Sequence, residues 1–471
     1  MKIPFIGPSY DVEARSFDVQ RSINLYPIVA EVANTKSVTA LRRTPGLKLF
    51  STAPGGPIRG GISSTDGRCF VVSAEFFVEI STDGTPTTWG NLNTQSGRVS
   101  IAENNTQIMV VDGQDGWIFD KVANTWEQIV DSDFPVTSYV TYQDGYFLVI
   151  EDGTQNFWIS ALGDGMLWDP LDFTSVESSS DNLIAVFSDH GNIWCFGNRS
   201  IEVYQNTGDA SFPFQRIPGA VIQTGCEAPF TIAKFSNTVI WLGTDEQGQG
   251  VVWMANGYSP QKVSTAAIEK KIATVINFST AWSFVYHEQG HLFYCLQIPG
   301  LETTLCYDAS TSQWHERMYK NADTNGMELH RASNFMFFNK MNLIGDRING
   351  NIYRMNLDYY DDAGDELVWI RISPHQQDEK RLLTYASFEL DVELAVGLST
   401  GQGSDPQIFL QYSDDGGRTW SSEIWRSPGK IGQYNRRVVW RKLGMARDRV
   451  FKVSGSDPVF YQLNEAFVNA T

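Results

Sequence analysis

Short apolar runs recur along the first 360 residues, and polar, glycine-containing turns separate them. The most apolar run of each repeat begins at Cys69, Ile108, Tyr146, Ile193, Val239, Leu292 and Met341. These starts are spaced by roughly 40–50 residues, the length of one four-stranded propeller blade. The pattern therefore predicts a β-propeller of about seven blades, in which neighbouring small sheets share one continuous core.

Two of the repeats end with the same local pattern. Asp120 follows a phenylalanine and precedes Trp126 by six positions, and Asp308 follows a tyrosine and precedes Trp314 by the same distance. An aspartate in this position can accept hydrogen bonds from the backbone N–H groups of a tight turn. We expect a hairpin at each place, with the tryptophan packed between neighbouring blades.

The repeat that begins at Met341 lacks a fourth strand after residues 351–355. The segment TPGLKLFST, residues 44–52, resembles YSPQKVST, residues 258–265, which closes an earlier repeat. We therefore expect residues 47–52 to complete the last blade and close the ring, which gives a propeller domain of residues 47–360.

Residues 1–46 are expected to form an extended N-terminal arm, because Pro4, Pro8 and Pro27 disfavour a helix. The one clear helical pattern in the chain is TAAIEKKIA, residues 265–273.

The pattern changes near residue 360. Residues 358–366 are polar and acidic, and the segments that follow alternate apolar with polar residues. Such alternation is typical of strands with one buried face. It predicts a C-terminal β-sandwich over residues 361–471, so the expected fold is all-β, a propeller followed by a sandwich.

Composition agrees with short strands and tight turns, since 13% of residues are aromatic and 40 are glycine. No apolar run approaches the roughly 20 residues of a membrane helix, and the N-terminus does not resemble a signal peptide. The five cysteines are scattered and stand mostly in apolar runs. We expect them to be buried, reduced thiols, with no metal and no cofactor bound.

The formal net charge is −18, which argues against a protein that grips DNA electrostatically. Residues 418–452 are the exception, with ten Lys or Arg against two acidic residues. This basic strip can be a solvated strand face, a docking surface for an acidic protein neighbour, or a DNA contact. Its candidate assembly residues are Arg426, Lys430, Arg436, Arg437, Arg441, Lys442, Arg447 and Arg449.

Three short motifs suggest chemistry but have structural interpretations. His287 to His291 reads HEQGH, which matches a zinc-protease pattern that works only on a helix; its flanks here are strand-like, and Gly290 indicates a hairpin. The segment from Ser413 to Trp420 matches the Asp-box of sialidases, a turn in which Asp415 and Gly417 shape the hairpin and Trp420 anchors it.

The third motif, Trp314 to Arg317 (WHER), would place its adjacent side chains on opposite faces of a strand. We assign it a structural role. No catalytic, cofactor-binding or metal-binding residue is therefore expected.

Several stretches, including SYVTYQDGYFLVIEDGTQNFWIS, CYDASTSQWHER, the opening NLYPI with LRRTPGL, and the C-terminal QYSDDGGRTW, resemble the packaged-DNA stabilisation, or tail-hub, proteins of short-tailed bacteriophages. The similarity spans nearly the whole chain. It implies a non-enzymatic protein of the virion tail, made in the host bacterial cytoplasm.

The resemblance further implies a six-fold homo-oligomeric ring, or nozzle, below the portal and its adaptor. That ring would help to close the tail channel, retain packaged DNA until ejection, and carry the tail needle and fibres or tailspikes. The acidic charge fits independently, because a wall that repels phosphate lets DNA pass without specific binding. Two alternatives stay open: a carbohydrate-active propeller enzyme of sialidase or depolymerase type, and a host-receptor-binding module.

Overall fold

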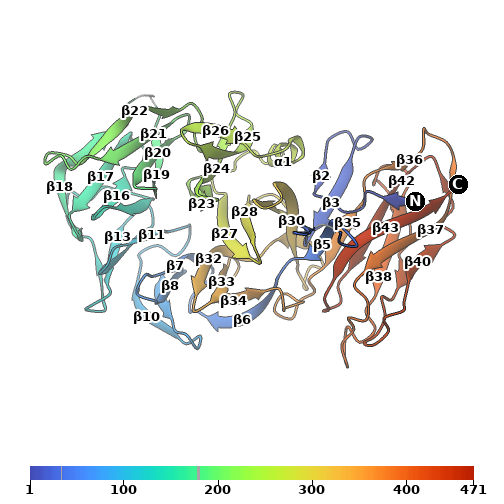
Figure 1. The fold of residues 1–471 in the computed structure, drawn as a ribbon. Helices are drawn as coiled ribbons and strands as arrows, with labels where there is room; N and C mark the ends of the chain where they lie inside the picture. Colours follow the sequence, from blue (N-terminus) through green and yellow to red (C-terminus); the bar gives the residue numbers. More distant parts are fainter. Residues whose placement is uncertain (33, 178–180) are drawn as a thin grey trace.

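The computed structural model describes residues 1–32, 34–177 and 181–471. Strands dominate these parts, accompanied by the α-helix α1 (Ala266–Ile272) and the single 3-10 turn η1 (Pro229–Thr231) (Figure 1). Residue 33 of the expected arm and residues 178–180 of the expected propeller lie outside the described residues. No helix of the described chain is long and apolar enough to cross a membrane. The all-β class expected from the sequence is confirmed.

Antiparallel four-stranded sheets form the larger part of the molecule, and in all but the last the strands follow chain order across the sheet (Figure 1). The first sheet is β7 (Ile58–Ser63), β8 (Cys69–Ser73), β9 (Phe76–Ile80) and β10 (Pro86–Asn91). The second is β11 (Ser100–Glu103), β12 (Gln107–Val111), β13 (Gly116–Asp120) and β14 (Thr125–Gln128). The third is β15 (Val140–Gln143), β16 (Tyr146–Ile150), β17 (Asn156–Ala161) and β18 (Asp164–Ser175).

The later sheets follow the same plan. The fourth is β19 (Leu183–Asp189), β20 (Asn192–Gly197), β21 (Ile201–Asn206) and β22 (Phe214–Ile222). The fifth is β23 (Ala233–Phe235), β24 (Thr238–Thr244), β25 (Gly250–Asn256) and β26 (Ser259–Lys262). The next four strands are β27 (Trp282–Glu288), β28 (His291–Gln297), β29 (Thr304–Asp308) and β30 (Gln313–Lys320). The last sheet is β32 (Ala332–Phe338), β33 (Met341–Asp346), β34 (Asn351–Asn356) and β6 (Gly46–Thr52).

The last sheet joins two distant parts of the chain. β6 pairs antiparallel with β34, so that Leu47 lies opposite Met355 and Thr52 opposite Asn351. β7, the first strand of the first sheet, contacts both β11 and β32. The blades therefore form a closed ring, and an N-terminal strand completes its last blade.

The number of blades differs slightly from the expectation of about seven. In the described chain, six four-stranded sheets are self-contained, and the four strands β27–β30 are not. Their outer strand β30 pairs onward with β3 (Val19–Ile23), which makes them part of a 12-stranded sheet. Six blades thus stand alone, because the remaining unit extends into the C-terminal domain.

The N-terminal residues, expected as an extended arm, form short strands that pair with distant parts of the chain. They form β1 (Lys2–Ile3), β2 (Tyr10–Asp11), β3, β4 (Leu25–Val29) and β5 (Thr39–Arg43). Leu25, Tyr26 and Leu41 of this segment are fully buried. Proline excludes a helix but is tolerated in an edge strand, and β4, which contains Pro27, is the edge of its sheet.

The C-terminal domain packs two sheets against each other. One has the order β4-β5-β43-β37-β40, with β1 paired to β43 and β41 (Met445–Ala446) paired to β37; the other continues from β3 as β35-β42-β38-β39. The C-terminal strands are β35 (Trp369–Ile372), β37 (Leu383–Val392), β38 (Ile408–Ser413), β39 (Ile424–Arg426), β40 (Val438–Arg441), β42 (Asp448–Gly455) and β43 (Gln462–Ala470). The short strands β31 (Met327–Leu329) and β36 (Gln376–Gln377) add to the larger sheet. Phe388 and Phe451, one from each sheet, meet in the core with ring centres 4.7 Å apart.

Candidate assembly surface

The basic strip belongs to the sandwich, where it runs through β39, β40 and β41 into β42, and β40 lies on the side of the sandwich away from the propeller (Figure 1). Eleven residues, 427–437, separate β39 from β40, and residues 430–437 of this loop are exposed. The exposed candidates are Arg426, Lys430, Arg436, Arg437, Arg441, Lys442 and Arg447. Seven of the eight candidates are therefore exposed on the sandwich.

Arg449 is the exception, and its assignment to a surface is wrong. Its side chain is 1% exposed and makes two hydrogen bonds to Asp414, of 2.6 and 2.7 Å. The guanidinium carbon also lies 4.2 Å from the ring centre of Tyr412. Alternation along β42 explains this, because Arg449 shares a strand face with the buried Phe451 and Val453.

Of the seven exposed cations, two have an acidic partner within the described chain. Arg437 makes a two-bond pair with Glu389, at 2.8 and 2.6 Å, and this hydrogen bonding lowers the pKa of Glu389. Lys430 is 3.8 Å from Asp405, and Arg436 donates to the neutral amide oxygen of Gln433 at 3.2 Å. Exposed pairs of this kind contribute little to stability, so these charges remain available to a partner.

The turn from Ser413 to Trp420 is a compact hairpin end. Asp415 accepts hydrogen bonds from the Thr419 hydroxyl at 2.7 Å and from the Thr419 N–H at 2.9 Å. These bonds hold the pKa of Asp415 well below its usual range. Gly417 has a φ of +78°, which a side chain would strain, and Trp420 lies 5.5 Å from the Lys452 ammonium. The geometry is that of a structural turn.

In the second blade, the Asp of the repeated pattern stabilises a turn and the Trp packs against the neighbouring blade. Asp120 accepts hydrogen bonds at 2.8 Å from the N–H groups of Val122 and Ala123. Trp126 stacks on Phe77 of the first blade with ring centres 4.4 Å apart, and its indole N–H donates to Asn91 of that blade. The turn is thus fixed locally while the tryptophan joins two blades.

The second copy of the pattern repeats this arrangement. Asp308 accepts from the Ser310 N–H at 2.9 Å and contacts His291 at 2.8 Å. Trp314 is 2% exposed, and its indole N–H donates to the carbonyl of Val263, which follows the outer strand of the preceding blade.

His287 and His291 do not lie on a helix. They belong to β27 and β28, and the hairpin turn between these strands consists of Gln289 (φ 47°) and Gly290 (φ 82°). Glu288 pairs with His291 across this turn. The described residues contain no group of three or more His, Cys, Asp or Glu that could hold a metal ion. The HEQGH segment is therefore a turn between propeller strands, as its flanks indicated.

Sequence reasoning missed a buried charge cluster around Glu316. This carboxylate is fully buried on β30; Arg21 donates to it at 3.1 and 2.5 Å, and the Lys271 ammonium lies 2.7 Å away. Burial would raise the pKa of Glu316, but Arg21 and Lys271 outweigh it and hold the pKa well below its usual range. The cluster ties together β3, α1 and β30. No sequence signal could have found it, because Arg21 stands 295 residues from Glu316.

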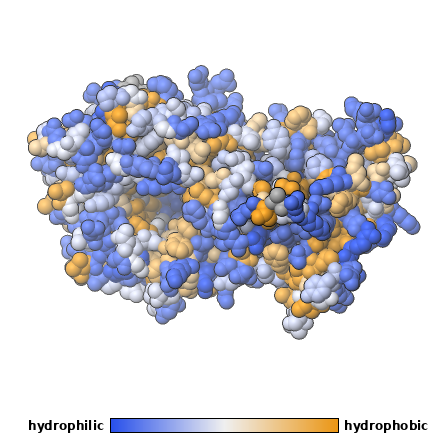
Figure 2. Space-filling model, in the orientation of Figure 1, coloured by the Kyte–Doolittle hydropathy of each residue, from blue (hydrophilic) through white to orange (hydrophobic). Residues whose placement is uncertain are grey.

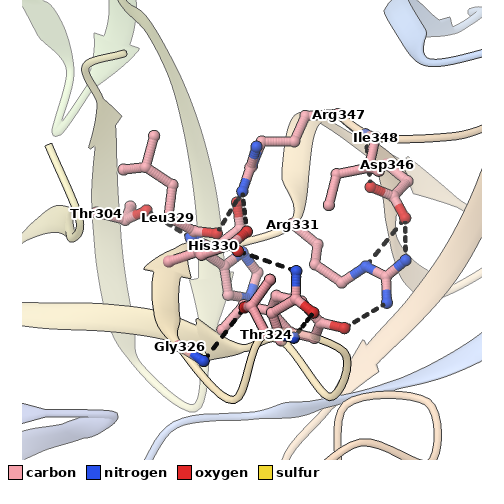
Figure 3. A network of polar contacts seen from close by, with 12 residues as sticks. Thr304, Thr324, Gly326, Leu329, His330, Arg331, Asp346, Arg347 and Ile348 are labelled. Carbon is pink, nitrogen blue, oxygen red and sulfur yellow. Dashed lines mark hydrogen bonds and ion pairs between the residues drawn. The ribbon is translucent and has the colours of Figure 1, made fainter. Parts of the chain in front are cut away.

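A second network lies where β31 leads into the last blade (Figure 3). Arg331 binds the buried carboxylate of Asp346 through two nitrogens, at 3.0 and 2.6 Å. Beside it Arg347 donates to the carbonyls of Leu329 and His330. Burial, with help from neighbouring arginines, lowers the pKa of His330 to about 3, so this imidazole is neutral and serves packing.

The five cysteines are all buried and free, as expected from their apolar surroundings. Cys295 and Cys306 are cross-strand partners, with their sulfur atoms 3.2 Å apart. Both thiols lie in the core of the β27–β30 unit, away from the basic strip.

Comparison with known proteins gives the chain its family. Residues 1–360 match the model of the bacteriophage P22 Gp10 β-propeller, and residues 368–471 match that of the bacteriophage P22 Gp10 β-sandwich. The tail hub protein gp10 of Salmonella phage P22 is 25% identical over 375 residues, which cover 75% of this chain and 75% of that protein.

Solved structures give only low similarity to this chain. The N-terminal domain of Nup159 has a TM-score of 0.43 and 8% identity, and covers 71% of this chain and 99% of its own. The WD40 domain of Neurospora crassa Pan2 has a TM-score of 0.43 and 7% identity, with 65% and 95% covered. The family matches span both domains in order, so the chain belongs to the P22 Gp10 family of bacteriophage tail hub proteins and is a component of the virion tail.

Proposed function

We propose that copies of this chain form a six-fold ring below the portal and its adaptor. The ring closes the tail channel, retains packaged DNA until ejection, and anchors the tail needle and the fibres or tailspikes. The observation that carries the proposal is the family match over both domains, in the same order as in the P22 tail hub protein.

The chain's charge supports the DNA-related part of this role. Its net charge of −18 repels phosphate, so DNA can slide along it without being held. The seven exposed cations on the sandwich are confined to one end of the molecule, where we propose that they meet protein. In this proposal the propeller (47–360) and the sandwich (361–471) are the ring's two building blocks, and residues 1–46 join them.

We infer that the protein acts structurally and not as an enzyme. The three segments that suggested chemistry lie in turns or in a buried strand, where hydrogen bonds within the chain occupy Asp415, His291 and Glu316. A carbohydrate-active enzyme or a receptor-binding module would hydrolyse or bind host surface glycan as the isolated chain. Assays with purified protein and host glycan should show neither activity.

Deletion of the gene, with complementation by the wild-type chain as control, tests the proposal. Without the chain, filled heads should lose their DNA during purification, and electron micrographs should show tails that lack needles and fibres. Deletion particles that keep their DNA and carry needles would contradict the proposed role.

A further inference from the structure

The chain carries its negative charge mainly at one end. Residues 100–175, the second and third blades, contain thirteen Asp or Glu and a single basic residue, Lys121. That lysine is buried and paired with Glu103 at 2.9 Å, so it adds little positive potential outside. β18 of the third blade and β40 of the sandwich lie at opposite ends of the molecule (Figure 1). One copy therefore presents an acidic end and a basic end that cannot meet each other.

At the outer edge of the acidic end, an exposed apolar side chain, Leu171, lies on a bulge of strand β18. β18 is the outermost strand of its blade, and its pairing with β17 jumps from Phe173 to Trp168, so residues 169–172 bulge outward. Leu171 at the tip is 80% exposed and is flanked by Asp169 and Asp172. Burial, and then the neighbouring Asp169, raise the pKa of Asp172, and no basic group of the described chain counteracts them. A cation from outside would stabilise this pair.

The basic end has a matching loop of opposite charge. Between β39 and β40, Ile431 is 63% exposed and Tyr434 is 71% exposed. They lie between Lys430 and Arg436, whose charges are only loosely engaged. On the face drawn in Figure 2 the surface is mostly hydrophilic; apolar side chains form scattered small groups and one larger area on the lower part of the right-hand half. Exposed apolar and aromatic tips flanked by charge have the composition of an interface centre with a polar rim.

We propose that the loop of residues 427–437 in one copy docks on the β18 bulge of the next copy. This inference rests on the proposed ring and names the surfaces that form it. Because the two surfaces differ and lie at opposite ends, the contact is head-to-tail, and it closes into a ring when the rotation between copies allows. Apolar contact of Ile431 and Tyr434 with Leu171 would provide the centre, and the flanking charges would set register and association rate. A second copy is the partner that the chain's own charge complementarity favours.

Charge reversal on each side, alone and together, tests the contact. One variant carries Asp169→Lys and Asp172→Lys, a second carries Lys430→Glu and Arg436→Glu, and a third carries all four changes. Each is expressed from the phage genome, and the amount of the chain in purified virion tails is measured. We expect the amount of the chain in tails to fall at least about tenfold for each two-site variant, because like charges then face each other. In the four-site variant, where opposite charges face each other again, most of that amount should be recovered.

The matched control is Glu246→Lys with Asp323→Lys, which changes two exposed acids elsewhere and should leave incorporation unchanged. Thermal melting of each purified chain verifies that it folds. If the four-site variant shows no recovery although the wild-type chain is present in tails, the docking model is wrong and the hub role stands. If the wild-type chain itself is absent from tails, the proposed function fails.

A cross-link gives an independent readout in the assembled virion. Leu171→Cys with Ile431→Cys in one chain should give a ladder of linked copies under mild oxidation, because the five native cysteines are buried. Each single cysteine variant should give no ladder. Tails that contain the double variant and yield only monomer would overturn the inference.

Discussion

Ile23 of β3 and Glu316 of β30 are direct partners in a parallel strand pair. On its other side Ile23 lies opposite Ile370 of β35. One short N-terminal strand thus joins a propeller unit and the sandwich into a single hydrogen-bonded sheet. The Glu316 charge cluster lies at this junction, so its loss should lower the stability of both domains.

Replacing Glu316 with glutamine should destabilise the protein by about 3–5 kcal/mol, because Arg21 and Lys271 would then lose their buried counter-charge. Denaturant unfolding at pH 7 measures the change. The matched control is Glu366→Gln, which breaks the partly exposed pair with Lys320 and should cost less than about 1 kcal/mol. Equal effects of the two substitutions would show that the Glu316 cluster adds no special stability.

The stability difference between wild type and Glu316→Gln should depend on pH. The folded-state pKa of Glu316 is depressed, so its stabilising contribution is full above the unfolded pKa of about 4.3 and is lost as pH falls toward the folded value. The stability gap between wild type and Glu316→Gln should therefore narrow below about pH 4. A gap that stays constant from pH 6 to pH 3 would contradict this assignment.

Asp362→Asn should stabilise the protein at neutral and alkaline pH. Asp362 is fully buried, neither carboxylate oxygen has a hydrogen-bond partner in the described structure, and burial raises its pKa to about 7. The raised pKa means that stability falls as pH rises from about 4 to 7, because folding then opposes loss of the proton. The variant should gain about 1–3 kcal/mol at pH 8 and much less at pH 4. Melting curves at the two pH values measure the difference, and a loss of stability at pH 8 would refute it.

Neutralising Arg436, Arg437, Arg441 and Lys442 together should weaken tail assembly and leave the monomer folded, because all four side chains are exposed. Raised salt should weaken assembly of the wild type more than that of the variant, since exposed charges are screened over about 8 Å at physiological ionic strength. Attachment of tails to DNA-filled heads at two salt concentrations is the measurement. If the variant tails attach to heads as well as wild-type tails at both salt concentrations, the strip is only a solvent-exposed face and not an interface.

Trp126→Ala should destabilise the propeller by about 2–4 kcal/mol, because the indole stacks on Phe77 and packs directly against the backbone of Gly90 in the first blade. Trp425→Ala is the control, since this tryptophan is 56% exposed on the sandwich. Chemical denaturation of the two variants should separate them clearly, and similar stabilities would argue against Trp126 as an inter-blade anchor.

Local sequence patterns were enough to predict many of the strands and turns. The Asp–Trp repeats around Asp120 and Asp308 mark hairpins because the hydrogen bonds that shape them span only two or three residues. Alternation along β42 would also have placed Arg449 inside, had it been compared with Phe451. In the basic strip, charge count alone could not separate this inward arginine from its exposed neighbours.

Other features depend on residues far apart in the chain and leave no local signal. The prolines of the N-terminal segment correctly exclude a helix, but the partners of its strands lie hundreds of residues away, as with Lys2 and Phe467. The cluster around Glu316 is invisible for the same reason. The bulge at Leu171 depends on a register shift that composition does not encode.

The pairing of the chain's opening strands has a consequence for synthesis on the ribosome. Ile3 pairs with Ala466, and Leu47 pairs with Met355, so these residues wait for partners that are made hundreds of residues later. Until then their strand edges are unpaired and prone to associate with other chains. Chains released before these partners are made would lack them, so the ring of blades and its junction with the sandwich are completed only after the partner strands have been translated.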